Sequence, residues 1–219
     1  LIKLDASNGT ETWVKRYDTH GYEDLPFRVT YNESRQNINV GGVAATANNL
    51  FDAIVLQYAT DGTLEYVHAS DYNVGIDQPT AFDTDTNGNV IIAGYYLNSN
   101  GDSNLSLISL DDTIGMNWHF TKGTTGYNSV YSDVLVDEAG NIYLTGFAEG
   151  EDNFYRVYTD KYSASGTKIW GLFYGVEGKD CFGIKLNLDI ENNVSIVGYT
   201  DDRQGTYNIL TLQYSNNGN

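Results

Sequence analysis

The 219-residue sequence is poor in cysteine, proline and basic side chains, and these shortages exclude several classes of protein. Its single cysteine, Cys181, excludes an intramolecular disulfide and any metal site built from several cysteines. Only 12 Lys and Arg residues stand against 29 Asp and Glu residues, and the formal net charge of −17 argues against nucleic acid or an anionic lipid surface as a partner. No run of about 18 apolar residues occurs, so we expect no membrane insertion.

Aromatic side chains and glycine are abundant instead, with 18 Tyr, 8 Phe, 3 Trp and 23 Gly. This many aromatic residues exclude a disordered chain, and many glycines with two prolines favour strands joined by tight turns. Abundant Asn, Tyr, Thr and Gly with almost no Cys is typical of bacterial surface and secreted proteins. The sequence opens inside an apolar run without an initiator Met, so we expect a trimmed segment of an extracellular or cell-surface protein.

Two series of residues recur about every 52 positions. The first series pairs an asparagine with a glycine five residues later: Asn37, Asn89, Asn141 and Asn193 with Gly42, Gly94, Gly146 and Gly198. The second series is Gly9, Gly62, Gly115, Gly166 and Gly218, and the first four are followed by Trp13, Tyr66, Trp118 and Trp170. A repeat of this length indicates a propeller or a solenoid.

Each cycle contains four short segments of alternating apolar and polar residues, separated by Gly, Asn and Asp turns. With the second cycle as the guide, the first and second strands lie near 80–84 and 90–94, and the third and fourth strands of the preceding cycle lie near 54–58 and 64–69. The fold class is therefore an all-β β-propeller of four-stranded antiparallel blades, with about 52 residues per repeat. We expect one domain over 1–219, with repeat units 1–52, 53–104, 105–155 and 156–208 and a partial unit 209–219. The ragged ends favour a segment of a larger ring over a ring of four blades.

The phrases VDEAGNIYLTG (136–146) and DKYSASGTKIW (160–170) resemble the SBBP-type β-propeller repeats of bacterial and archaeal surface proteins. This resemblance implies a non-catalytic, extracellular propeller of about seven blades. The segment LDASNGTETW (4–13) instead resembles the quinoprotein-type propeller repeat, in which a tryptophan docks between blades. The first cycle departs from the SBBP pattern, because residues 33–36 replace the turn that begins with Asp in the other cycles.

A possible metal site begins at Asp83, where Asp83, Asp85 and Asn87 alternate before Gly88 as in the first half of a calcium loop. The acid expected eleven residues after Asp83 is Gly94, so the loop is incomplete. An Asp at position 85 is explained more simply as the cap of a hairpin turn. We therefore expect no cofactor, with calcium as the alternative.

Catalytic patterns are absent from the sequence, since the three histidines fall at non-equivalent positions and no Ser/His/Asp, Cys/His or GxSxG arrangement occurs. We therefore expect a protein that is not an enzyme. Acidic residues on the rim between blades are the candidate binding residues: Asp24, Asp77 and Asp180. Asp160 is a fourth candidate, because it takes a third-strand position that holds Ile2, Leu56, Ile108 and Leu212 in the other cycles. Its carboxylate should be partly solvated and have a polar partner.

Three functions remain open at this point. The first is a non-catalytic interaction or structural module that binds protein or glycan at the cell surface, or other segments of the same polypeptide. The second is a propeller enzyme, quinoprotein-like or glycan-cleaving, whose active site is completed by further blades. The third is a calcium-stabilised spacer of an adhesin or filament. Paired carboxylates that converge on the central funnel would favour the enzyme.

Overall fold

The computed structural model describes residues 1–219 except 19–20, 22, 46–50, 71–76, 112–114 and 124–125, and except the side chains of residues 51, 69, 70 and 77. All regular structure in the described part is β-strand, in five antiparallel sheets. None of the described residues forms a helix that is long and apolar enough to cross a membrane. An N-terminal hairpin consists of β1 (Ile2–Leu4) and β2 (Glu11–Val14).

Three sheets have four strands each, and the last sheet has three. Blade 1 consists of β3 (Asp24–Asn32), β4 (Asn37–Ala45), β5 (Phe51–Ala59) and β6 (Leu64–Ser70). Blade 2 consists of β7 (Asp77–Thr84), β8 (Val90–Leu97), β9 (Ser103–Leu110) and β10 (Met116–Lys122). Blade 3 consists of β11 (Ser129–Val136), β12 (Ile142–Glu149), β13 (Tyr155–Tyr162) and β14 (Lys168–Tyr174). Blade 4 consists of β15 (Asp180–Leu188), β16 (Val194–Asp201) and β17 (Tyr207–Tyr214).

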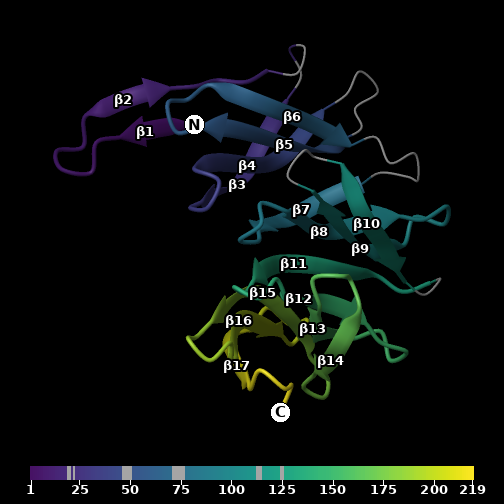
Figure 1. Ribbon diagram of the computed structural model, residues 1–219. Helices are drawn as coiled ribbons and strands as arrows, with labels where there is room; N and C mark the ends of the chain where they lie inside the picture. Colours follow the sequence, from purple (N-terminus) through teal and green to yellow (C-terminus); the bar gives the residue numbers. More distant parts are fainter. Residues whose placement is uncertain (19–20, 22, 46–50, 71–76, 112–114, 124–125) are drawn as a thin grey trace.

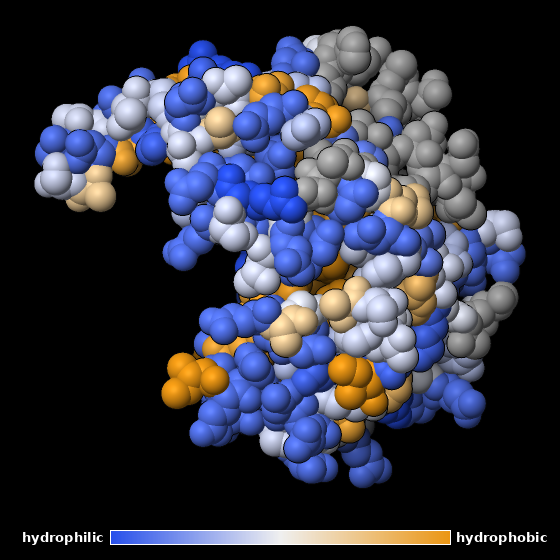
Figure 2. Space-filling model, in the orientation of Figure 1, coloured by the Kyte–Doolittle hydropathy of each residue, from blue (hydrophilic) through white to orange (hydrophobic). Residues whose placement is uncertain are grey.

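The blades follow one another along an arc, and their first strands border its concave side (Figure 1). The space-filling view shows this concave side as an open notch (Figure 2). We call it the axial notch, and its walls are β3, β7, β11 and β15. The β-propeller fold class expected from the repeat is confirmed.

The turn between the first and second strands of a blade explains the asparagine series. Asp85 Oδ1 accepts hydrogen bonds from the backbone N–H groups of Asn87 and Asn89, and its Oδ2 accepts one from the Asn89 side chain. Asp137 and Asp189 do the same in the later blades. In these turns carboxylate oxygens satisfy backbone donors that the hairpin leaves unpaired.

The first cycle reaches a similar turn with different residues. Asn32 accepts hydrogen bonds from the Arg35 N–H and the Ser34 hydroxyl, and Gln36 takes the left-handed backbone conformation with φ 58°. Gly88 and Gly140 hold this position in blades 2 and 3 with φ 90° and 82°. The departure at 33–36 therefore changes the turn residues but retains the hairpin.

The glycine series marks a close approach between the first two strands. Each first strand carries a β-bulge, and the residue that begins the bulge pairs with the glycine. A Cβ atom on the glycine would overlap the backbone of the bulged strand, for example the Val130 carbonyl oxygen at Gly146. Only glycine allows this packing, which accounts for its return in every repeat.

The outer strands of neighbouring blades are joined by tryptophan. The indole N–H of Trp13, Trp118 and Trp170 donates to a backbone carbonyl in the hairpin turn of the following blade. The accepting residues are Thr60, Ala164 and Asn216, at 3.2, 3.2 and 2.9 Å. Each indole ring also packs on a positive-φ glycine two residues beyond the acceptor: Gly62, Gly166 and Gly218.

A tryptophan docked between blades is the feature implied by the second resemblance, at 4–13. The one aromatic residue of the series that is not a tryptophan, Tyr66, has no indole N–H and is 47% exposed. The junction between blades 1 and 2 therefore differs from the others at its outer edge. Assignment to either repeat family stays a prediction.

Candidate functional site

Four charged side chains from the four inner strands meet at the axial notch. Arg28 on β3 lies 3.5 Å from Asp83 on β7 and 3.5 Å from Asp133 on β11. Lys185 on β15 lies 2.9 Å from the same oxygen of Asp133. We call Arg28, Asp83, Asp133 and Lys185 the axial charge cluster, and it links all four blades.

Both carboxylates of the cluster are also anchored to the backbone of the next blade. Asp83 Oδ2 accepts the Val136 N–H at 2.9 Å, and Asp133 Oδ2 accepts the Leu186 N–H at 3.0 Å. The Asp133 side chain is only 3% exposed and that of Asp83 is 13% exposed. These anchors set the direction of each carboxylate, so the pair is held in position before any ligand binds.

The two acids differ in their electrostatic surroundings. Burial raises the pKa of Asp83 above its ordinary value, and the charge of Asp133 adds to this rise, while Arg28 and two backbone N–H groups oppose it. Asp133 has a second cation, Lys185, on its other side. The site therefore combines a carboxyl group whose pKa is raised with a carboxyl group that lies between two cations. Such a pairing can divide acid and charge-stabilising roles between two like residues.

The cations of the cluster face the notch more than the acids do. The side chain of Arg28 is 27% exposed and that of Lys185 is 60% exposed. Both can donate hydrogen bonds to a ligand while remaining near Asp133. A polar ligand in the notch would thus meet the cations first.

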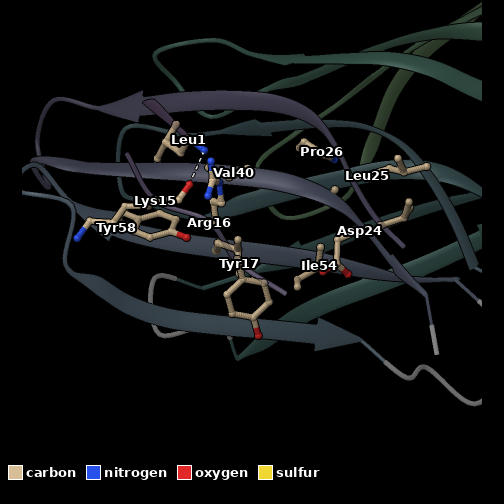
Figure 3. A pocket seen from close by; sticks show the side chains of 13 residues that line it. Leu1, Lys15, Arg16, Tyr17, Asp24, Leu25, Pro26, Val40, Ile54 and Tyr58 are labelled. Carbon is tan, nitrogen blue, oxygen red and sulfur yellow. Dashed lines mark hydrogen bonds between the residues drawn. The ribbon is translucent and has the colours of Figure 1, made fainter. Parts of the chain in front are cut away.

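The binding residues expected from the sequence lie apart from this cluster. Asp24 is at the start of β3 and lines a cavity on the flank of blade 1, together with Arg16 and Tyr17 (Figure 3). Asp180 begins β15 and forms a two-pronged ion pair with Arg203, which lowers the pKa of the Asp180 carboxyl group. The side chain of Asp77 lies outside the described part of the structure.

Asp160 is fully buried between blades 2 and 3 instead of partly solvated. Its Oδ2 accepts hydrogen bonds from the hydroxyl groups of Tyr131 (2.8 Å) and Tyr162 (3.1 Å). Its Oδ1 accepts no hydrogen bond of good geometry within the described residues, but it lies 2.6 Å from Lys168 Nζ. The expected polar partners are present, and they are enough to compensate a buried charge.

The three residues of the calcium hypothesis point to different partners. Asp83 contacts Arg28 and β11, whereas both oxygens of Asp85 are used within its own turn. Asn87 contributes its backbone N–H to that turn. Among the described residues, no group of three or more His, Cys, Asp or Glu side chains is placed to hold a metal ion. Calcium binding stays a prediction without a gathered ligand set.

Three residues of the axial charge cluster were missed in the sequence: Arg28, Asp133 and Lys185. The signal was present, because each follows the bulge of its first strand and pairs beside the repeated glycine. Ala81 takes the same place in blade 2. This position holds Arg, Ala, Asp and Lys in blades 1 to 4. A side chain that differs in every repeat is not required by the repeated fold.

The site and fold define a β-propeller with buried carboxylates at its axis. No family model matches the chain, and no curated protein matches it in sequence. Similar solved structures include an endo-arabinase from Bacteroides thetaiotaomicron, with 11% identity and a TM-score of 0.54 over 96% of this chain and 82% of that chain. An α-L-arabinanase from Penicillium chrysogenum has 8% identity and a TM-score of 0.59, over 90% of this chain and 64% of that chain. An α-L-arabinofuranosidase from Clostridium thermocellum has 13% identity and a TM-score of 0.52, over 90% and 70%.

These comparisons correct two expectations. The three structures named above are those of arabinan- or arabinoside-degrading enzymes, which contradicts a non-catalytic interaction module and a protein that is not an enzyme. A catalytic site assembled from separate blades would leave no local sequence motif. At such low identity the similarity itself shows the shared fold, and the enzyme alternative is the one that it favours.

Proposed function

We propose that this chain is a glycan-cleaving β-propeller whose reaction centre is the axial charge cluster. The observation that carries the proposal is the convergence of Asp83 and Asp133, from neighbouring inner strands, on one arginine. Paired carboxylates at the axis are the feature that separates an enzyme from a binding module of the same fold. The named activities of the similar propellers provide further support.

Glycoside hydrolysis needs a proton donor for the leaving oxygen and a negative charge beside the oxocarbenium-like transition state. Asp83 fits the donor, because burial raises its pKa and favours the protonated form. Asp133 fits the second role, because its carboxylate is anchored by the Leu186 N–H and oriented by Arg28 and Lys185. The exposed parts of the two cations would hold sugar hydroxyl groups in the notch.

The proposed substrate is an arabinose-containing glycan. Support for this class comes from the arabinan-degrading enzymes that share the fold. An extracellular or cell-surface location fits such a substrate, and the acidic, cysteine-poor composition is compatible with it. A polymeric glycan would reach the cluster from the concave side of the arc (Figure 2).

The test is hydrolysis of arabinan and of arabino-oligosaccharides, followed as the release of reducing ends. Asp83→Asn and Asp133→Asn should each lower kcat/KM at least about 100-fold, as expected when a catalytic acid or an oriented charge is lost. Asp152→Asn is the matched control, because its carboxylate is exposed and forms an ion pair with Arg156 outside the axial charge cluster. Activity that survives both cluster variants, or a wild-type protein inactive on every arabinoside, would refute the proposal.

A further inference from the structure

A second cavity lies away from the axial notch, between blades 2 and 3. It has a volume of about 250 Å³ and is lined on one side by Lys122 at the end of β10 and on the other by Tyr158 and Phe173 of blade 3. Asn128 and Glu149 line it as well, and none of the axial charge cluster does. The cavity is slightly smaller than the range of about 300–1,000 Å³ that suits drug-sized ligands, so it fits a single compact ring.

An exposed aromatic side chain forms one wall of the cavity. Phe173 lies on β14, the outer edge strand of blade 3, and is 60% exposed. Its ring stacks on the buried ring of Tyr158, with centroids 4.5 Å apart and an angle of 21°. Stacking fixes the orientation of the Phe173 ring, which presents a flat apolar surface suited to the C–H face of a sugar ring.

Lys122 brings a positive charge that has no ion-pair partner among the described residues. Its Nζ donates to the Tyr158 hydroxyl oxygen at 3.1 Å, and Lys168 Nζ donates to the same oxygen at 2.6 Å. Lys168 is neutralised by Asp160, but no carboxylate of a described residue lies within the 4.0 Å of an ion pair from Lys122. Partial burial and the charge of Lys168 lower the pKa of Lys122. A bound anion would favour the charged form of Lys122 and so oppose both effects.

The remaining polar groups favour hydroxyl groups over further negative charge. Glu149 Oε2 is held by the backbone and side-chain N–H groups of Asn128, at 3.1 and 3.2 Å. Glu149 and Glu151 both line the cavity, and their carboxylates accept hydrogen bonds. They would repel a single group with two negative charges, such as phosphate, more strongly than the one carboxylate of a sugar ring. One carboxylate on a ring rich in hydroxyl groups matches this arrangement.

We infer that this cavity binds a hexuronate residue of an acidic glycan, with the sugar ring on Phe173 and its carboxylate on Lys122. The site lies on the rim between blades 2 and 3, away from the axial notch, and would hold a polysaccharide there. This inference goes beyond the proposed function and does not depend on it, because no residue is shared.

The test is isothermal titration calorimetry, which measures the affinity of the full chain for trigalacturonate and for the neutral trisaccharide of the same linkage. Wild-type protein should bind the acidic sugar at least tenfold more tightly than the neutral one. Lys122→Gln and Phe173→Leu should each weaken binding at least tenfold, because one removes the charge and the other the ring. Lys179→Gln and Tyr207→Leu are matched controls away from the cavity and should bind like the wild type.

Further titrations distinguish uronate binding in this cavity from hydrolysis at the axis and from the binding of any small anion. Asp133→Asn should keep full affinity for trigalacturonate, so failure of the hydrolysis proposal would leave this result unaffected. Equal affinity for trigalacturonate and for acetate or inorganic phosphate would overturn the sugar part of the inference. No binding by the wild type, or binding unchanged by both cavity variants, would overturn it entirely. Melting curves of each variant confirm that any loss does not come from unfolding.

Discussion

The inner and outer edges of the blades are held together by different chemistry. At the outer edge, an indole ring and its N–H make the same contact with the next blade at three junctions, those of Trp13, Trp118 and Trp170. At the inner edge, ion pairs join strands that are one or two blades apart, and the contributing residue changes from Arg in blade 1 to Asp in blades 2 and 3 and Lys in blade 4. A contact that recurs in each blade stabilises the fold. A contact whose residues differ between blades is not needed for the repeat, and its residues can be selected for function.

The junctions between blades also differ along the outer edge. Trp170 and Trp118 both rest on a positive-φ glycine, but Gly115, at the corresponding place after Tyr66, does not have a positive φ. Its turn is instead closed by the Asp111 carboxylate, which accepts the Gly115 N–H. The junction between blades 1 and 2 therefore has neither the indole ring nor the positive-φ glycine of the tryptophan contact. Four predictions probe these differences.

The largest effect is expected at the inner edge. Asp133→Ala leaves the Leu186 N–H without its acceptor and removes the shared partner of Arg28 and Lys185. We expect a loss of about 3 kcal/mol in the free energy of unfolding, near the lower end for a broken buried pair, because Lys185 stays hydrated. Urea denaturation measures this. Asp152→Ala, which breaks an exposed pair, should cost less than about 1 kcal/mol, and an equal cost for both would contradict the comparison.

The next effect concerns the outer edge. Trp170→Phe removes the hydrogen bond to the Asn216 carbonyl and part of the apolar surface that covers Gly218. The expected loss is about 1–2 kcal/mol. Tyr66→Phe at the other kind of junction should cost less than about 0.5 kcal/mol. Thermal or urea unfolding measures the loss of stability in each variant. A larger loss for Tyr66→Phe than for Trp170→Phe would contradict a stabilising role of the tryptophan contact.

A smaller effect depends on pH and isolates Asp83. Its pKa in the folded protein is raised above 3.8, so the folded state binds this proton more tightly than the unfolded chain does. The resulting stability is fully present below the unfolded pKa and is lost as the pH rises through the folded pKa. The urea midpoint of the wild type should therefore fall relative to that of Asp83→Asn as the pH is raised from below 3.8 to neutrality. A constant difference across this range would show that Asp83 ionises normally.

The smallest effect is expected for Tyr66→Trp. This change supplies the missing indole, but the turn after it lacks the positive-φ glycine on which the other rings rest. We expect a change of less than about 0.5 kcal/mol in either direction. A gain above about 1 kcal/mol, measured by urea unfolding, would show that the indole alone makes the contact.

Much of the fold could be predicted because each repeat carries its own local chemistry. Asp85, Asp137 and Asp189 cap their turns as expected, and the strands begin and end within a few residues of the alternating segments. The candidate site could not be predicted in this way. Asp160 stood out because it breaks an apolar pattern, yet its partners Tyr131 and Lys168 come from other strands. The repeat pattern predicted a polar partner for Asp160, but it did not predict the full burial of the carboxylate or the strands from which the partners come.

The sequence by itself determined the strands, the turns and their repetition, because alternation and turn residues act over a few neighbouring positions. Only the tertiary structure decided which charges meet. Arg28, Asp83, Asp133 and Lys185 lie one per repeat, and they come together because each first strand is turned toward the same axis. That convergence depends on the angle between whole blades, which results from packing across every junction. No local pattern records it, and so the paired carboxylates emerged only in the folded chain.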